Sequence, residues 1–212
     1  MRSFRHWTPR YVWNRVALMR FEKKNPDVPW LTAQAIYILS TWLKPDDAGL
    51  EWGSGRSTVW FAKRVRSLVS VEHDAAWGRH VPEMLRGSAV AGRVDYRVLG
   101  EDLDQGARSA YVRVAAELEN ASLDFCLVDG VLRDHCAMAC TEKLKPGGLL
   151  VIDNINWYLP HAPVSHAPGS RTMTQGTASA AWAEFSERVA GWRYVWTSNG
   201  VWDTAIWVKP SA

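Results

Sequence analysis

Residues 50–58, L-E-W-G-S-G-R-S-T, constrain the fold more than any other part of the chain. The segment has the pattern of an apolar strand end, a turn with two glycines and the first turn of a helix. Gly53 and Gly55 have no Cβ, so the chain can turn tightly there and a ligand can approach the backbone. The amides that begin the helix offer donors to an anionic group. This pattern predicts an α/β sheet with a nucleoside cofactor at the turn.

The residues around the turn favour a single nucleoside over a dinucleotide. The dinucleotide pattern G-x-G-x-x-G has a third glycine where this chain has Thr58. The apolar run 67–71 ends in Glu72, and a carboxylate at a strand end can accept hydrogen bonds from both ribose hydroxyls. A nicotinamide-dependent oxidoreductase is the alternative, which the missing glycine disfavours.

Three later segments follow in order: S-V-E-H-D at 70–74, L-V-D-G at 127–130 and L-K-P-G-G-L-L-V-I-D-N at 144–154. Together with the glycine turn, they make residues 45–209 resemble the class I S-adenosylmethionine-dependent methyltransferases. The segment V-D-G-x-x-R-x-x-C at 128–136 also resembles a group of bacterial methyltransferases. The resemblance implies S-adenosylmethionine as the cofactor. It also implies a Rossmann-like, doubly wound, mostly parallel seven-stranded sheet with an antiparallel C-terminal strand.

Hydrophobic periodicity agrees with an α/β domain. Parallel strands are predicted at 49–52, 68–72, 94–99, 123–129 and 149–153, with helices between them. Segments 192–197 and 204–208 flank a Ser198-Asn199-Gly200 turn and predict a hairpin. The 212 residues, 47% of them hydrophobic, suffice for one core. We expect residues 1–44 to form a basic and aromatic helical cap and residues 45–212 to form the cofactor-binding unit.

The N-terminal arm concentrates positive charge. Against Glu22, residues 1–24 carry seven basic residues: Arg2, Arg5, Arg10, Arg15, Arg20, Lys23 and Lys24. We favour a helix packed on the domain with a solvated basic face. The alternative is an amphipathic arm that lies on a membrane surface or attracts an anionic acceptor. A noncatalytic membrane-associated binding module is an alternative to an enzyme, and this arm is the feature that supports it.

The sequence has no nucleic-acid-binding motif, membrane span or signal peptide, and this bears on the expected partners and compartment. No nucleic-acid-binding motif accompanies the basic arm, so no nucleic-acid partner is expected. No stretch has the roughly 18 apolar residues of a membrane span, and the charged N-terminus does not fit a signal peptide. We expect a cytoplasmic protein, with peripheral contact at the inner membrane surface as the alternative. The odd number and spacing of Cys126, Cys136 and Cys140 favour buried thiols over disulfides or a zinc site.

Ligands of open α/β sheets bind beyond the carboxyl ends of the strands. Asp102 is the candidate for the adenine amino group, in competition with Glu101 and Asp104. Hydroxyls at the start of the helix could bind the methionine carboxylate or cap the helix. The predicted cofactor-binding residues are Glu51, Gly53, Ser54, Gly55, Ser57, Thr58, Glu72, His73, Asp102 and Asp129.

A second resemblance concerns a metal. Cation-dependent O-methyltransferases of this fold hold a divalent ion with an acid after the fourth strand and an Asp-Asn pair after the fifth. In this chain the corresponding residues are Asp129, Asp153 and Asn154, whose oxygens suit magnesium. Such an ion would lower the pKa of an acceptor hydroxyl and orient it toward the methyl group. This interpretation predicts transfer to an oxygen of a small molecule or glycoconjugate. Metal-free transfer to nitrogen is the alternative.

Without a metal, a histidine is the natural proton acceptor near neutral pH. His161 and His166 lie in the loop 155–177, directly after the Asp-Asn pair, and join Asp129 and Asp153 as catalytic candidates. Three residues are candidates for acceptor contact. Arg133 would bind an acid or organise the loop, and Trp157 with Tyr158 would stack on a sugar or an aromatic acceptor.

Overall fold

The structure, a computed structural model, describes residues 7–211, so residues 1–6 of the basic arm lie outside it. One seven-stranded sheet with the order β3-β2-β1-β4-β5-β7-β6 organises the chain. β7 is antiparallel to both of its neighbours, and the other neighbouring strands are parallel. The predicted fold is confirmed. The strands are β1 Ala48–Trp52, β2 Ser67–Glu72, β3 Val94–Val98, β4 Leu123–Val128, β5 Leu144–Asp153, β6 Arg193–Ser198 and β7 Asp203–Val208.

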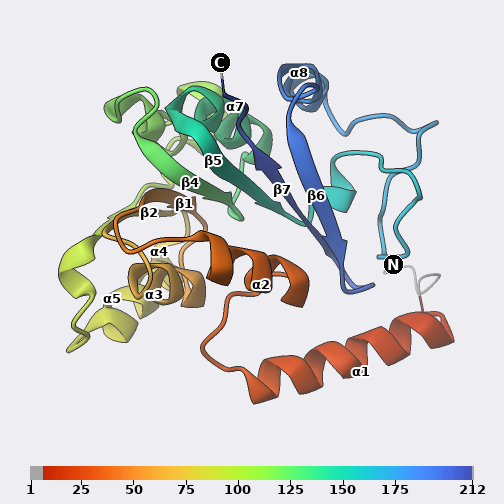
Figure 1. Cartoon of the computed structure of the whole chain (residues 1–212), viewed down its shortest axis with the longest axis horizontal. Coiled ribbons are helices and arrows are strands. Elements are labelled where there is room, and N and C mark those ends of the chain that lie inside the picture. The colour runs from red at the N-terminus through yellow and green to blue at the C-terminus, as the bar shows by residue number, and fades with distance from the viewer. Residues whose placement is uncertain (1–6, 212) are drawn as a thin grey trace.

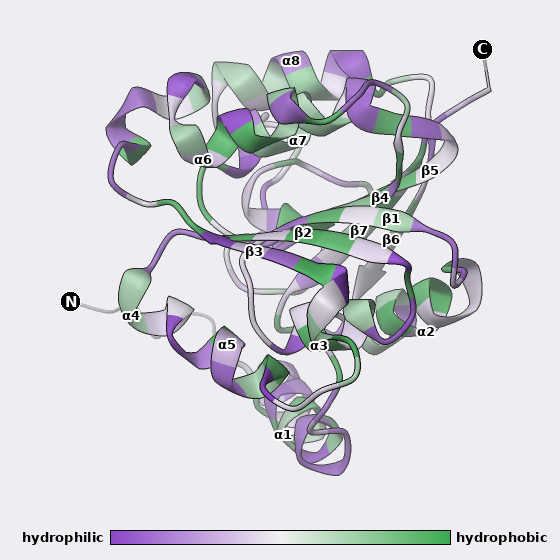
Figure 2. Cartoon of the chain, turned by 90° about the vertical axis from the view of Figure 1, so that its left-hand side faces the viewer, coloured by the Kyte–Doolittle hydropathy of each residue, from purple (hydrophilic) through white to green (hydrophobic). Residues whose placement is uncertain are grey.

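Helices cover both faces of the sheet. Figure 2 shows α6, α7 and α8 on one side of the sheet and α1 to α5 on the other. The α-helices are α1 Pro9–Lys24, α2 Ala33–Trp42, α3 Arg56–Ala62, α4 Ala75–Gly78, α5 His80–Leu85, α6 Ala110–Arg113, α7 Arg133–Lys143 and α8 Ala180–Arg188. Short 3-10 helices are η1 Ala91–Arg93, η2 Leu103–Arg108, η3 Val114–Glu117 and η4 Ile155–Trp157.

Strand residues alternate between two buried clusters, because successive side chains of a strand point to opposite faces. In β5, Leu149 and Val151 pack with α2 and α3, whereas Leu150 and Ile152 pack with α7 and α8. The three cysteines are buried free thiols, as predicted. β5 begins at Leu144, five residues earlier than predicted. The sequence Pro146-Gly147-Gly148 concealed this first part, and the register between β5 and β4 is interrupted there.

The β6–β7 hairpin holds α2 against the sheet. Thr32 caps α2 by accepting from the Ala35 amide. Thr32 is fully buried, and its own amide donates to the Thr204 hydroxyl at 3.2 Å. Its hydroxyl also hydrogen-bonds to that of Thr197. The N-terminal cap is therefore joined to the last two strands of the chain.

α1 lies below α2 and away from the sheet (Figure 1). Thr8 caps this helix, and Leu18 is its one buried residue. The β6–β7 turn points toward α1 in Figure 1, and a Cβ on Gly200 of that turn would collide with the Asn14 side chain. Among residues 7–211, no helix is long and apolar enough to cross a membrane. The domain boundary at residue 44 stays a prediction.

Candidate functional site

Gly53 lets three strand ends come together. Its amide donates to the Val71 carbonyl at 2.9 Å, and the Asp129 amide donates to the Trp52 carbonyl at 2.8 Å. Gly53 has a φ of +94°, and a Cβ there would lie 2.7 Å from the backbone carbon of Asp129. Any other residue would strain the backbone and collide. At Gly55 a Cβ would only touch Trp77 at 3.7 Å, so the packing does not require this second glycine.

A buried polar cluster supports the turn from below. Glu51 is fully buried, and its Oε2 accepts from the hydroxyls of Thr58 and Ser70, both at 2.7 Å. The Thr58 hydroxyl in turn accepts from the Gly55 amide at 2.9 Å. Within residues 7–211, Oε1 of Glu51 has no hydrogen-bond partner. Burial raises the pKa of Glu51 to about 7.

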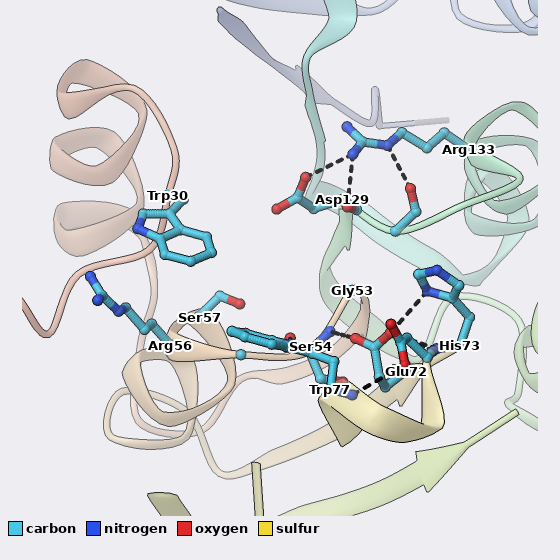
Figure 3. A pocket seen from close by; sticks show the side chains of 13 residues that line it. Trp30, Gly53, Ser54, Arg56, Ser57, Glu72, His73, Trp77, Asp129 and Arg133 are labelled. Atoms are coloured by element: carbon cyan, nitrogen blue, oxygen red, sulfur yellow. Dashed lines mark hydrogen bonds and ion pairs between the residues drawn. The ribbon is translucent and has the colours of Figure 1, made fainter. Parts of the chain in front are cut away.

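A cavity of about 470 Å³ opens at the carboxyl ends of β1, β2 and β4. Figure 3 shows Trp30 and Arg56 on one side, Glu72 and His73 on the opposite side, and Asp129 with Arg133 along a third. Seven of the ten predicted cofactor-binding residues line this cavity. They are Gly53, Ser54, Gly55, Ser57, Glu72, His73 and Asp129.

Glu72 is held in place at the end of β2. Only 3% of the residue is exposed. Its Oε1 accepts from the amides of His73 and Asp74 at 2.8 Å, and its Oε2 accepts from the Ser54 amide at 3.1 Å. A carboxylate has about four lone-pair positions. Nδ1 of His73 also lies 2.9 Å from Oε1, so the position left for a ligand hydroxyl is on Oε2. The ribose contact of Glu72 stays a prediction.

Two tryptophans that the sequence analysis did not assign to the site line the same cavity. The ring centroids of Trp30 and Trp77 are 6.3 Å apart, and the Arg56 guanidinium lies 5.0 Å from the Trp30 ring. Trp77 is oriented by its indole N–H, which donates to the Ser54 carbonyl at 2.8 Å. The sequence holds one signal for Trp77: Asp74, which follows the strand acid Glu72, caps α4. Trp30 lies in the connection between α1 and α2 and belongs to no motif.

Three predicted cofactor residues are not on the cavity wall. Glu51 and Thr58 lie beneath the turn, as described above. Asp102 lines a separate hollow with Arg97, and its carboxylate accepts from the Ala110 amide at 2.8 Å. The structure therefore does not bring Asp102 to the site, and the predicted adenine contact does not fit its placement.

Arg133 ties the ends of β4 and β5 together. Its Nε donates to the Gly130 carbonyl at 2.8 Å, and its Nη1 donates to the carbonyl of Asp153 and to Oδ1 of Asn154. Its Nη2 donates to the Asp129 carbonyl at 2.8 Å and lies 3.0 Å from Oδ1 of Asp129. The guanidinium thus makes four hydrogen bonds and one ion pair. These bonds support the loop-organising interpretation of this residue.

The residues predicted to bind magnesium do not fit a metal site as they are arranged. The Arg133 guanidinium already contacts Asp129 and Asn154, and a divalent ion between the same oxygens would meet this positive charge. The third predicted ligand, Asp153, accepts from the Thr204 hydroxyl through Oδ1. In the part of the chain that the structure describes, no group of three or more His, Cys, Asp or Glu side chains could hold a metal ion.

A second cavity of about 430 Å³, here called the acceptor cavity, adjoins the first one. The two cavities share Trp30 and Asp129. Burial and the neighbouring Asp129 charge raise the pKa of Asp153 well above its usual range, and burial also raises the pKa of Asp129 against the opposing effect of Arg133. The acceptor cavity is lined by Arg15, Glu22, Trp30, Asp129, Asp153, Asn154, Trp157 and Trp202.

The other predicted residues divide between the acceptor cavity and the surrounding packing. Trp157 is on the cavity wall, 45% exposed, with its indole N–H donated to the Pro168 carbonyl at 3.0 Å. Tyr158 instead stacks on Trp182 at 4.9 Å and does not line the acceptor cavity. Sequence reasoning missed Arg15, Glu22 and Trp202, which reach the cavity from α1 and the β6–β7 turn.

His161 and His166 line a third cavity, of about 550 Å³. His161 stacks on Trp196 with ring centroids 4.4 Å apart, and its Nδ1 lies 3.2 Å from the Pro163 carbonyl oxygen. The structure therefore separates both candidate bases from the cavity that holds Asp129 and Asp153. Neither histidine is placed to accept a proton in the acceptor cavity.

The fold is shared with known methyltransferases. The chain matches no protein-family model and no curated protein at a significant level. The O-methyltransferase TomG from Streptomyces achromogenes, solved in complex with S-adenosylmethionine, has a TM-score of 0.59 and 19% identity over 96% of this chain and 91% of its own. A methyltransferase from Geobacter sulfurreducens has a TM-score of 0.57 and 16% identity over 93% and 88% of the two chains. A methyltransferase-like protein from Silicibacter pomeroyi has a TM-score of 0.56 and 21% identity over 87% and 89%. This chain has the Rossmann-like methyltransferase fold.

Proposed function

We propose that this protein transfers a methyl group from S-adenosylmethionine to an oxygen of a small-molecule or glycoconjugate acceptor. The observation that carries the proposal is the pair of cavities that meet at Asp129 and Trp30. One cavity has a buried carboxylate at a strand end and two indoles, which suits a nucleoside. The other has a buried carboxyl group, Asp153, beside a half-buried one, Asp129, and this pair suits proton transfer. Fold alone does not determine activity, whereas the groups that line these two cavities restrict it.

The first cavity offers a group for each part of the cofactor. Glu72 would accept hydrogen bonds from the ribose hydroxyls, and Trp30 and Trp77 would contact the adenine ring through flat apolar surfaces. Ser54 and Ser57 supply hydroxyls at the start of α3 for the amino-acid end. The volume of about 470 Å³ lies within the usual range for small-molecule sites. A nicotinamide dinucleotide is disfavoured because the dinucleotide fold has β6 next to β5, whereas here the antiparallel β7 separates them.

The chemistry requires an electrophile and a proton acceptor. S-adenosylmethionine supplies the methyl group: the oxygen–carbon bond forms as the carbon–sulfur bond breaks, S-adenosylhomocysteine leaves, and the hydroxyl proton passes to a carboxylate. Asp129 lies at the junction of the cavities, and Asp153 lies beside it in the acceptor cavity. Their raised pKa values make both carboxylates better bases than exposed ones. Arg133 fixes Asp129, and no metal is needed in this scheme.

An amine acceptor is the second candidate. Glu22, Asp129 and Asp153 place three carboxyl groups around the acceptor cavity, and such a set would also attract a cationic amine. Oxygen is preferred because carboxyl groups with raised pKa values are suited to taking a proton from a neutral hydroxyl. A solved structure of the same fold, TomG, is likewise named an O-methyltransferase.

Calorimetry with S-adenosylmethionine, S-adenosylhomocysteine and nicotinamide dinucleotide tests the proposal. We expect the first two to bind and the dinucleotide not to bind. Glu72→Gln should weaken cofactor binding at least tenfold, about 1.4 kcal/mol, while Glu101→Gln on a nearby exposed loop should not. Asp153→Asn should keep cofactor affinity within twofold but slow methyl transfer at least tenfold. Folded protein that releases no heat with either sulfur nucleoside would refute the assignment.

An acceptor screen with labelled cofactor distinguishes the two acceptor classes. Pools of phenols, saccharides, lipid-linked glycans and amines are compared with and without magnesium and a chelator. We expect methyl ethers as products, at rates that chelation does not change. Methylated amines as the sole products would favour the second candidate, and loss of turnover on chelation would restore the metal-dependent scheme.

A further inference from the structure

Resting on the proposed function, we infer that the acceptor is an oligosaccharide that occupies two cavities at once. The unit that receives the methyl group lies in the acceptor cavity. The following units extend beneath α1 into the third cavity, here called the distal cavity. It is lined by Arg10, Asn14, Gln34, His161, Pro163, Val164, Ser165, His166, Trp196, Ser198, Asn199 and Gly200.

The same two elements wall both cavities. α1 contributes Arg10 to the distal cavity and Glu22 to the acceptor cavity, which are about 18 Å apart along a helix that rises 1.5 Å per residue. The β6–β7 turn contributes Asn199 to the distal cavity and Trp202 to the acceptor cavity. The two cavities therefore share the same two walls, and a chain-like ligand is placed along α1 across both.

Aromatic side chains give both cavities surfaces for sugar rings. In the acceptor cavity, Trp157 is 45% exposed, although a tryptophan is usually largely buried. Trp157 is fixed by its bond to the Pro168 carbonyl, so its orientation is set before a ligand binds. In the distal cavity, Trp196 carries the stacked ring of His161. A pyranose presents C–H groups on its face and hydroxyls at its edge, which suits an indole bordered by polar groups.

The polar groups of the distal cavity are mainly neutral. Amides from Asn14, Gln34 and Asn199 and hydroxyls from Ser165 and Ser198 outnumber its one arginine and two histidines. Such groups match hydroxyls, whereas a phosphate or sulfate ester would require more cations. A single phenol ring would use the acceptor cavity and leave the distal cavity without a role.

Two buried N–H donors lack a partner, one from each cavity. The Asn199 Nδ2 and the Trp202 Nε1 have no hydrogen-bond acceptor within residues 7–211. The Asn199 amide is not free to turn over, because its Oδ1 accepts from the amides of Val201 and Trp202, both at 2.9 Å. Buried donors without acceptors are unfavourable, and both belong to residues that wall the two cavities.

The test varies acceptor length in the wild-type protein. Linear hexose, N-acetylhexosamine and uronic-acid oligosaccharides of one to four units are compared with phenols, using labelled S-adenosylmethionine. We expect kcat/KM to rise at least tenfold from one unit to three or four. Equal kcat/KM for all lengths would overturn the inference, and so would turnover of phenols or amines without any turnover of carbohydrate.

A blocking variant tests the distal cavity separately. Gln34 is exposed on α2 and lines only the distal cavity among the three, so Gln34→Trp should fill it without touching the cofactor site. We expect at least a tenfold higher KM for the three-unit acceptor, with unchanged turnover of the one-unit acceptor. Ser40→Trp, also exposed on α2, is the control and should change neither. An unchanged KM in Gln34→Trp would contradict the two-cavity inference. If S-adenosylmethionine itself does not bind, the proposed function fails first, and calorimetry reveals this independently.

Discussion

At the scale of single residues, Arg133 places a positive charge against the oxygens of Asp129 and Asn154, where a metal ion was predicted. It follows Asp129 by four residues, so the first turn of α7 folds its guanidinium back over the end of β4. Leu132 precedes it with a φ of +48°, a conformation that a leucine rarely adopts. This strained position directs the chain into α7 at the point where Arg133 can reach the end of β5. The V-D-G-x-x-R spacing thus connects two strand ends through one side chain.

Removing the guanidinium should have two measurable effects. Arg133→Ala leaves the Asp129 carboxylate and three backbone carbonyls without their donor, which we expect to destabilise the fold by about 3 kcal/mol. It also frees the oxygens of Asp129 and Asn154, so millimolar Mg²⁺ should raise the Tm of the variant but not that of the wild type. Thermal unfolding with and without Mg²⁺ measures both effects, with Arg133→Lys as the charge-preserving control. An equal Mg²⁺ shift in the wild type would show that the arginine does not exclude a metal.

Glu51 makes stability depend on pH, because burial raises its pKa from 4.5 to about 7. Below pH 4.5 the group is protonated in both folded and unfolded chains. Between pH 4.5 and 7 the folded chain keeps a proton that the unfolded chain has lost, so the contribution of this group to stability falls as the pH rises. Glu51→Gln cannot ionise, and we expect it to be more stable than the wild type by about 1–3 kcal/mol at pH 8.5. At pH 5.5 the difference should be smaller. Urea unfolding at both values tests this, and a pH-independent difference would count against a buried ionisable Glu51.

At the scale of elements, the glycine turn and the strand ends could be predicted because their signals are local. An apolar run followed by Gly53, or one that ends in Glu72, specifies its own structure. The acceptor side could not be predicted in this way. Arg15 and Trp202 reach the acceptor cavity from opposite ends of the chain through tertiary packing, and no sequence spacing encodes that contact.

One buried amide accounts for the position of His161 and His166 away from Asp129 and Asp153. Asn156 is 1% exposed, and its Oδ1 accepts from the Asp203 amide at 3.1 Å. Its Nδ2 donates to the Pro168 carbonyl at 3.3 Å. These bonds hold the 155–177 loop against the β6–β7 hairpin, so its histidines line the distal cavity. A lone asparagine in a proline-rich loop gives no such signal in the sequence.

The contact between the β6–β7 turn and α1 can be tested at Gly200. This residue has a φ of +76°, and an added Cβ would collide with the Asn14 side chain. Gly200→Ala should cost about 1–3 kcal/mol of stability for the strained backbone and should also displace α1. We expect a higher KM for the acceptor and an unchanged Kd for S-adenosylmethionine, whose proposed cavity does not include the turn.

Gly87→Ala is the matched control for this variant, because Gly87 has a φ of +74° and nothing within 4 Å of an added Cβ. It should lose similar stability through strain but keep the acceptor KM. If both variants change KM alike, the effect comes from backbone strain in general and not from α1.

At the scale of the whole molecule, α1 exposes apolar as well as basic side chains. Glu22 and Asn14 line the cavities, whereas four large apolar residues face solvent. The exposed apolar residues are Val12 at 43%, Trp13 at 70%, Val16 at 38% and Met19 at 56%. The predicted helix with a solvated basic face walls the cavities, and its solvated surface is both basic and apolar. Its exposed basic residues are Arg10, Arg15, Arg20, Lys23 and Lys24.

This surface suits an anionic lipid surface. Apolar residues 12, 13, 16 and 19 lie along one side of the helix, Arg20 follows them, and Lys23 and Lys24 lie in the last turn. Aromatic and aliphatic side chains on one side of a helix can enter the interface of a bilayer while nearby cations contact acidic headgroups. A helix bound in this way would keep its inner face over the acceptor and distal cavities, so membrane contact and acceptor binding are compatible.

Vesicle co-sedimentation tests this at whole-molecule scale. We expect binding to vesicles that contain phosphatidylglycerol, weaker binding to pure phosphatidylcholine, and loss of the difference at high salt. The double variant Trp13→Ser, Met19→Ser should reduce partitioning at least tenfold, about 1.4 kcal/mol. Tyr37→Ser removes a side chain that is also 70% exposed, but on α2, and should not reduce it. Cofactor affinity should stay the same in all variants, because α1 does not line the cofactor cavity. Equal partitioning of the double variant and the wild type would mean that the apolar side of α1 has a role other than binding lipid.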